Sequence, residues 1–382
     1  MFILLTSILR KKPIQIVKKQ IDWQKMFRYA EYHNVLTLFY YSVLGLEKEF
    51  GGNLGETLYQ RYKKELLQQS SYRTAEEAIS WKLEQYHVHA VLLSGTAEYG
   101  LYDPAEMGGI THLEFLVETD SLGKIHELMT EMDYERKEEQ GYRGIFYIRA
   151  PGVRVRFLDE IPEAGPRIRK VLEHQARGKP YVRQLPLEKQ YIYFLAAFLE
   201  NYFLGKITIR HILDFYLFRE KFGSTALGER TEELLKKTGL NELERDLTEL
   251  GELWFSNGVP GEESSTVLAL EEYILDPGKS DPALDKRLLL SSGRRLDFYG
   301  RDREEEWRER RKGWMFPSVD YMKQFFPILD KAPFFFFFCW GIRSFRIWEK
   351  IAEQNIGELK KTILEKYKRK KSVEGAKGEN ED

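Results

Sequence analysis

Four polar side chains occupy alternate positions in two segments that are otherwise largely apolar. His112 and Glu114 alternate with apolar residues in "THLEFLVE", and Arg154 and Arg156 alternate with valine and phenylalanine in "VRVRF". Residues two apart on a β-strand project from the same face. Such a face can do two kinds of chemistry: carboxylate oxygens are ligands for Mg²⁺, whereas a guanidinium fork matches the oxygens of a phosphate.

The region around these segments has the period-two patterning of strands, from residue 87 to about 162. "HAVLLSG" predicts a buried strand that runs into Ser94 and Gly95, "THLEFLVE" predicts a second strand, and "YRGIFYIRAPGVRVRFLDE" predicts two strands around an Ala-Pro-Gly turn. "SLGKIHELMTEM" predicts a helix that Ser121 can cap. This order predicts a small mixed sheet with helices on one side, and a concave face on which His112, Glu114 and Arg154 converge.

Helical patterning flanks this region on both sides. Asp22 can cap a helix that begins at Trp23, and "ETLYQRYKKELLQQSSYRTAEEAISWKLEQY" contains no proline or glycine to stop a helix. The sequence therefore predicts an α+β protein with a helical region (1–86), a core (87–162), a second helical region (163–365) and a disordered charged tail (366–382). The helices should cover the side of the sheet away from the cleft and bury six apolar side chains there: Leu113, Phe115, Val117, Val153, Val155 and Phe157.

The amino-acid composition indicates which kinds of partner and which cellular compartment to expect. The 382 residues contain 59 lysines and arginines against 60 aspartates and glutamates, so no global field recruits nucleic acid or an anionic membrane. One cysteine, Cys339, excludes an internal disulfide, and the first residues do not have the order of a secretory signal, so we expect the cytoplasm. The aromatic run at 334–340 is too short to span a membrane and predicts a buried segment, or an interaction patch if it is exposed. The charge run "RDREEEWRERRKGW" predicts a solvated face.

Several familiar catalytic motifs are absent from the sequence. "YILDPGKS" ends like a phosphate-binding loop, but Tyr273 occupies the position of the required first glycine, so a turn is favoured. His87 and His89 have no third ligand nearby in the sequence, which favours ordinary histidines over a zinc site. Cys339 lies among aromatic residues, where a thiol behaves as a small hydrophobic group rather than a nucleophile.

The order of the segments resembles that of nucleotidyltransferases of the DNA polymerase beta type, and more closely an uncharacterised bacterial nucleotidyltransferase family. The matching pieces are "IDWQKMFRYAEYHNVLTLFY", "LLSG", "GGITHLEFLV", "VRVRF", "ITIRHILDFYLF" and "FPSVDYMKQFFPILDKAPFFFFFCWGIR", which together cover residues 1 to about 350. The resemblance implies a transferase that uses a nucleoside triphosphate, an Asp-x-Asp pair and a third carboxylate to hold Mg²⁺ for an in-line displacement.

The sequence departs from the family pattern where the chemistry should be. Gly95 of the glycine turn is kept, and Ser94 replaces the lysine before it. His112, Glu114 and Arg154 replace the three aspartates, and Gly108 replaces an arginine. Only Glu114 remains a carboxylate, which holds Mg²⁺ weakly by itself, and a guanidinium repels the metal. Four nearby acids could in principle substitute: Asp103, Glu106, Glu118 and Asp159. Against two of them, Asp159 has the opposite strand parity to Arg154, and Glu118 lies four residues beyond Glu114 along the strand.

Two functions from different classes fit these departures. The first is a degenerate member of the family that binds a nucleotide or another phosphate-bearing ligand, or a protein partner, through positions such as Ser94, Gly95, Arg154 and Arg156. The second is a working NTP-dependent nucleotidyltransferase that uses Mg²⁺ at an altered site and transfers to an unidentified acceptor. A third interpretation concerns the site alone: Glu114 and Arg154 form only a cross-strand ion pair.

Overall fold

This computed structural model describes residues 1–11, 21–46, 50, 53–95, 100–139, 142–161, 166–173, 177–178, 180–226, 228–256, 264–275, 284, 287–288, 322, 326 and 328–341. The chain forms two compact units, Met1–Trp314 and Met315–Asp382. The charge run at 301–314 and the predicted disordered tail at 366–382 lie outside the described residues. Among the residues that are described, no helix is both long and apolar enough to cross a membrane.

The first unit is built on one mixed sheet of seven strands in the order β3-β4-β5-β2-β1-β7-β6. The strands are β1 (Ala90–Ser94), β2 (Leu113–Val117), β3 (Glu135–Lys137), β4 (Ile145–Arg149), β5 (Val153–Leu158), β6 (Arg177–Gly178) and β7 (Val182–Gln184). β1 runs antiparallel to β2, β2 runs parallel to β5, and β4 and β5 form the predicted hairpin. The α+β fold class is confirmed. The sheet extends beyond the predicted range, because β7 pairs with β1.

One face of the sheet is apolar and packs against two helices, α4 (Leu54–Gln85) and α5 (Leu122–Glu131). The six side chains predicted to need burial are at most 5% exposed, which confirms that part of the prediction. α4 contributes Tyr72, Ala75, Ile79 and Leu83 to this layer. The period-two alternation of β2 and β5 therefore fixes which face of the sheet meets α4.

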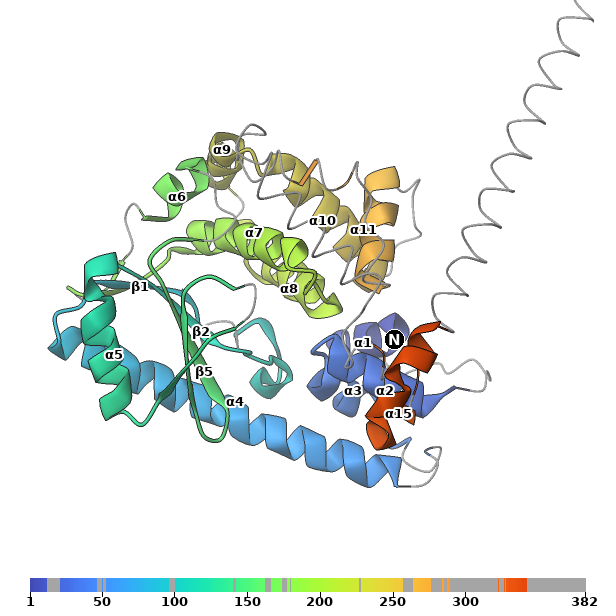
Figure 1. The fold of residues 1–382 in the computed structure, drawn as a ribbon. Coiled ribbons are helices and arrows are strands. Elements are labelled where there is room, and N and C mark those ends of the chain that lie inside the picture. Colours follow the sequence, from blue (N-terminus) through green and yellow to red (C-terminus); the bar gives the residue numbers. More distant parts are fainter. Residues whose placement is uncertain are drawn as a thin grey trace, which may run out of the picture. The chain divides into compact units, whose positions relative to one another are not determined.

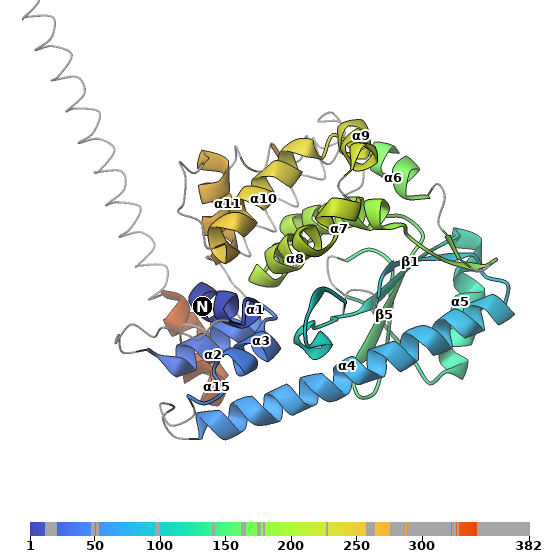
Figure 2. The same ribbon diagram turned by 180° about the vertical axis from the view of Figure 1, so that it is seen from behind.

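The opposite face of the sheet is also covered, by helices of the second helical region. Figures 1 and 2 show α7 (Leu187–Phe203) and α8 (Ile209–Ala226) on the other side of the sheet from α4. The prediction of helices on one side and an open cleft on the other is therefore wrong. The physical reason is that Tyr193 and Glu200 on α7 supply partners for the polar side chains of β2 and β5, so this face can also be buried.

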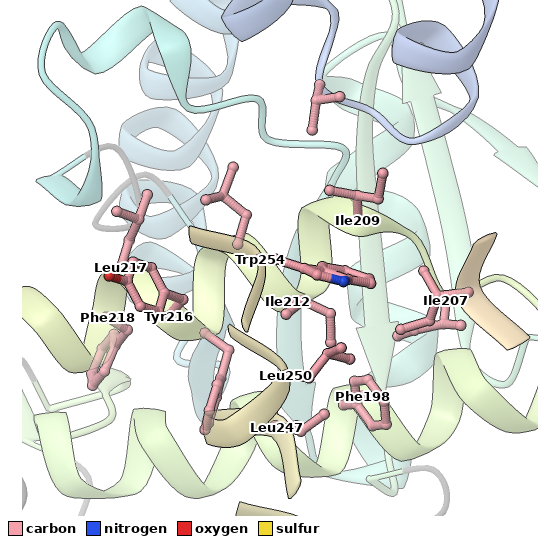
Figure 3. Packing of buried hydrophobic residues seen from close by; sticks show 14 of the residues in the cluster. Phe198, Ile207, Ile209, Ile212, Tyr216, Leu217, Phe218, Leu247, Leu250 and Trp254 are labelled. Carbon is pink, nitrogen blue, oxygen red and sulfur yellow. The ribbon is translucent and has the colours of Figure 1, made fainter. Parts of the chain in front are cut away.

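Most of the remaining helices pack into a second apolar cluster that includes α7, α8 and α10 (Figure 3). They are α1 (Phe2–Leu9), α2 (Trp23–Tyr32), α3 (Leu36–Ser42), α6 (Pro166–Glu173), α9 (Glu229–Thr238), α10 (Asn241–Phe255) and α11 (Ser265–Leu275), with short 3₁₀ turns η3 (Ala105–Met107) and η4 (Thr119–Ser121). Asp22 caps α2 as predicted, since its side chain accepts a hydrogen bond from the Lys25 N–H at 2.9 Å. Ser121 precedes α5 without a side-chain cap bond.

In the second unit, α15 (Ile328–Lys331) is followed by the 3₁₀ turn η6 (Pro333–Phe335) and a short helical stretch. The prediction that the aromatic run is buried is wrong for four of its side chains: Phe334, Phe335, Phe337 and Phe338 are 78%, 37%, 71% and 67% exposed. Spacings of three and four residues place these rings on one helical face, and Cys339 lies buried on another. Length and hydrophobicity alone cannot show which face of so short a helix meets the core.

Candidate functional site

The sheet brings three of the predicted positions into one row across neighbouring strands. Ser94 at the end of β1 pairs with Glu114 on β2, and Glu114 pairs with Arg156 on β5. A shift in the register between Leu92 and Ser94 places Ser94 opposite Glu114. In parallel β2 and β5, Glu114 faces Arg156 rather than Arg154, which lies two residues earlier on the same face.

Glu114 is a buried carboxylate with partners from three elements. Its Oε1 accepts hydrogen bonds from His112 Nε2 at 2.9 Å and from Arg156 Nη1 at 2.8 Å, and its Oε2 accepts one from the Tyr193 hydroxyl on α7. Burial opposes the charged form, but His112, Arg156 and Tyr193 outweigh it and hold the pKa of Glu114 below its usual range. An ionised carboxylate only accepts hydrogen bonds, so His112 donates through Nε2.

The Arg156 guanidinium lies at the centre of this network and is 1% exposed. Nη1 donates to Glu114 and, at 2.9 Å, to Glu200 Oε2, while Nη2 donates to Glu200 Oε1 at 2.5 Å. Nε donates to the Arg143 carbonyl at 2.8 Å. Burial would lower the pKa of Arg156, but the two carboxylates raise it above its ordinary value, so the guanidinium stays charged. Burial raises the pKa of Glu200, although Arg156 opposes this shift.

Arg154 lies on the same face but is bound to a different partner. Its Nη2 forms an ion pair with Glu139, and its side chain is 34% exposed. The Phe146 ring on β4 lies beside both guanidiniums, with the Arg154 and Arg156 Cζ atoms 5.6 Å and 5.4 Å from its centroid. The interpretation of a Glu114–Arg154 ion pair on a partly exposed sheet is therefore wrong. Arg156 makes that contact, because it is the residue in register with Glu114.

The Gly95 turn at the end of β1 is approached closely by α4. A Cβ atom at Gly95 would lie 2.5 Å from Glu76 Oε2 and 3.0 Å from a Leu92 methyl carbon. A larger residue at position 95 would therefore displace the Glu76 side chain and press against Leu92. A phosphate placed against the same side of the turn would meet the Glu76 carboxylate, and like charges at that distance repel.

Each acid that might have substituted for the family aspartates is either engaged elsewhere or exposed. Asp103 pairs with Lys11 at 2.7 Å, Glu106 accepts from the Tyr41 hydroxyl, Asp159 accepts from Thr119, and Glu118 is exposed. Within the described residues, no group of three or more histidine, cysteine, aspartate or glutamate side chains is arranged to hold a metal ion. The donor set around Glu114 does not fit Mg²⁺, because Arg156 contacts one oxygen of this carboxylate and the Tyr193 hydroxyl contacts the other.

Two residues of the network, Tyr193 and Glu200, were not predicted from the sequence. Both lie on α7, in "PLEKQYIYFLAAFLENYFLG", and both are nearly inaccessible to solvent. A signal was present: a carboxylate in the middle of an apolar helix needs a charged or hydrogen-bonding partner if it is buried. The sequence could not show that this partner is Arg156, 44 positions away along the chain.

The family model described as an uncharacterised nucleotidyltransferase matches residues 19–256. This match covers well over half of the chain, and the chain belongs to that family. Neither a curated protein nor a solved structure shows a significant match.

Proposed function

We propose that this chain is a nucleotidyltransferase-family protein whose metal site is degenerate and which acts as a nucleotide-binding or anion-binding module, or as an interaction module for a protein partner. The observation that supports the proposal is the contact of the Arg156 guanidinium with both Glu114 and Glu200. A fixed positive charge occupies the place of the metal between these carboxylates. Two-metal catalysis needs carboxylate oxygens free to bind Mg²⁺, and here they are engaged.

Arg154 is the better candidate for contact with a phosphate-bearing ligand. The N–H groups of Arg156 donate to protein oxygens, and its side chain is almost inaccessible. Arg154 is one-third exposed, and its buried Nε atom has no hydrogen-bond partner among the described residues. Burial lowers the pKa of Lys206, and the positive charge of Arg154 adds to this effect, so a second cation lies within electrostatic range of Arg154. A guanidinium binds phosphate oxygens without a metal.

The alternative function, an active NTP-dependent nucleotidyltransferase, has one observation in its favour. Glu114 and Glu200 lie within hydrogen-bond distance of the same nitrogen, Arg156 Nη1, so two carboxylates are close together. They would offer oxygen ligands to Mg²⁺ only if the guanidinium withdrew. Withdrawal removes the counter-charge that Glu114 and Glu200 share, which is strongly unfavourable for buried carboxylates. The degenerate module is therefore the function we propose first.

The test combines a transfer assay with a binding assay. Purified protein is incubated with each labelled NTP, Mg²⁺ or Mn²⁺ and a cell extract as the source of acceptors, and binding of the four NTPs is measured by isothermal titration with and without Mg²⁺. We expect no label transfer, and binding that is independent of metal and lost in Arg154→Ala. Robust transfer that is abolished by Glu114→Gln, in a variant shown to be folded by circular dichroism, would establish the active enzyme instead.

A further inference from the structure

Described residues between β3 and β4 contact the two guanidiniums. We call these residues, 138–139 and 142–144, the cover segment. Three of its described residues contact the site: Glu139 pairs with Arg154, the Arg143 carbonyl accepts from Arg156 Nε, and the Tyr142 ring lies 5.0 Å from the Arg156 Cζ atom. The Tyr142 hydroxyl also donates to Asn201 Oδ1 on α7 at 3.1 Å. The cover segment therefore bridges the sheet and the helix that faces it.

The surroundings of Glu139 are those of an anion-binding site. Its carboxylate forms an ion pair with the Arg154 guanidinium. Burial lowers the pKa of Lys206, and the negative charge of Glu139 opposes this shift, so Lys206 is a second cation within electrostatic range. Lys206 lies over the Tyr142 ring, with Nζ 3.8 Å from the centroid. The Glu139 side chain is 21% exposed. Arg154 beside the Phe146 ring and Lys206 over the Tyr142 ring provide the positive charge of an anion-binding site, and the Glu139 carboxylate is the anion in it.

Glu139 uses only some of the hydrogen-bond donors of the Arg154 guanidinium. Glu139 accepts from Nη2, while the buried Nε of Arg154 has no hydrogen-bond partner in the part of the chain that the structure describes. A carboxylate carries one negative charge, whereas a phosphate monoester carries about 1.5 to 2 at pH 7 and has three acceptor oxygens. A phosphate in the place of the Glu139 carboxylate can accept hydrogen bonds from Nε and Nη2 of Arg154 together, and its larger negative charge is attracted more strongly to Lys206.

We propose that Glu139 is a built-in occupant of the Arg154 phosphate site, and that a phosphate monoester or the terminal phosphate of a nucleotide binds by displacing it. This inference rests on the proposed function, since it specifies how the same site is regulated. Displacement breaks the Arg154–Glu139 ion pair, which is one of the contacts that hold the cover segment against the sheet. Ligand binding is thereby coupled to opening of the cover segment, and the unliganded protein is autoinhibited.

The test uses Glu139→Gln with Glu138→Gln as its matched control. Glu138 is the exposed neighbour, so the control makes the same change of charge one position away from the ion pair. Binding of inorganic phosphate and of ATP, both in EDTA, is measured by titration calorimetry. We expect Glu139→Gln to bind about three- to tenfold more tightly than wild type, the range expected for a partly exposed ion pair, and Glu138→Gln to bind as wild type. Arg154→Lys, which keeps the charge but loses the fork, should abolish the gain.

Hydrogen exchange without ligand separates the two proposals. Loss of the ion pair should speed amide exchange in residues 142–146 of Glu139→Gln but not of Glu138→Gln. If Glu139→Gln binds phosphate no better than wild type and exchanges at the same rate, while Arg154→Ala still abolishes binding, the autoinhibition is refuted and the proposed function stands. If no variant binds either probe, both proposals fall.

Discussion

Replacement of Arg156 by methionine tests the interpretation of the buried network most directly. Methionine keeps much of the length and the apolar stem of arginine but removes the charge and four hydrogen bonds, three of them to carboxylates. Glu114 and Glu200, each 5% exposed, are left in a buried place without this counter-charge. Breaking a buried ion pair by removing one partner costs about 3–5 kcal/mol, and we expect Arg156→Met to lower the free energy of unfolding by this amount.

The loss of unfolding free energy in Arg156→Met should be smaller at low pH than at high pH. Without Arg156, the folded-state pKa of Glu200 rises further above its unfolded value, because burial is less opposed. The folded-state pKa of Glu114 also rises from its wild-type value, because only His112 and Tyr193 still oppose burial. The folded variant then binds more protons than the unfolded chain, so its stability increases as pH falls, and the deficit relative to wild type should be smaller at pH 5 than at pH 8. Urea denaturation of both proteins at the two pH values measures this difference.

Two further variants make the result specific. The triple variant Arg156→Met, Glu114→Gln, Glu200→Gln removes all three charges and should recover most of the loss, because neutral amides are far less costly to bury than unpaired carboxylates. Arg143→Met is the matched control: this side chain is 61% exposed and reaches Glu160 at 3.4 Å, so its loss should change stability by about 0.5 kcal/mol or less. A cost below about 1 kcal/mol for Arg156→Met would refute the view that the guanidinium compensates two buried carboxylates.

Two more predictions concern stability away from Arg156. Burial, aided by His211, lowers the pKa of His33 to about 3, so the unfolded chain takes up a proton near its ordinary pKa of 6.5 while the folded chain does not. The contribution of neutral His33 to the free energy of unfolding is therefore fully present above about pH 6.5 and falls by about 2 kcal/mol between pH 7 and pH 5. In urea denaturation, His33→Asn should lose correspondingly less stability over this pH range. The same pH dependence in His33→Asn and wild type would contradict the assignment to His33. Gly144, just before β4, has a φ of +87°, and a Cβ there would lie 2.5 Å from the Phe157 carbonyl oxygen. Gly144→Ala should cost at least about 1–3 kcal/mol and lower the melting temperature, whereas the same change at Gly123 on α5, where a Cβ meets nothing within 4 Å, should not.

The sequence by itself determined the elements and their faces. Alternation in β2 and β5 placed Leu113, Phe115, Val155 and Phe157 in the core and put the polar residues on the opposite face, because side chains on a strand alternate strictly. The capping residue Asp22 and the uninterrupted α4 were also predictable, since both follow from local chemistry. The order of these segments was enough to indicate the family.

Only the tertiary structure decided what the polar face does. The pairing of Glu114 with Arg156 rather than Arg154 depends on the register of two parallel strands, and local patterning cannot distinguish residues that share one face. The buried state of that face depends on α7, which brings Glu200 to Arg156 from 44 positions further along the chain. A charge becomes a structural ion pair or a ligand site according to what covers it, and that covering is a long-range contact that no local pattern encodes.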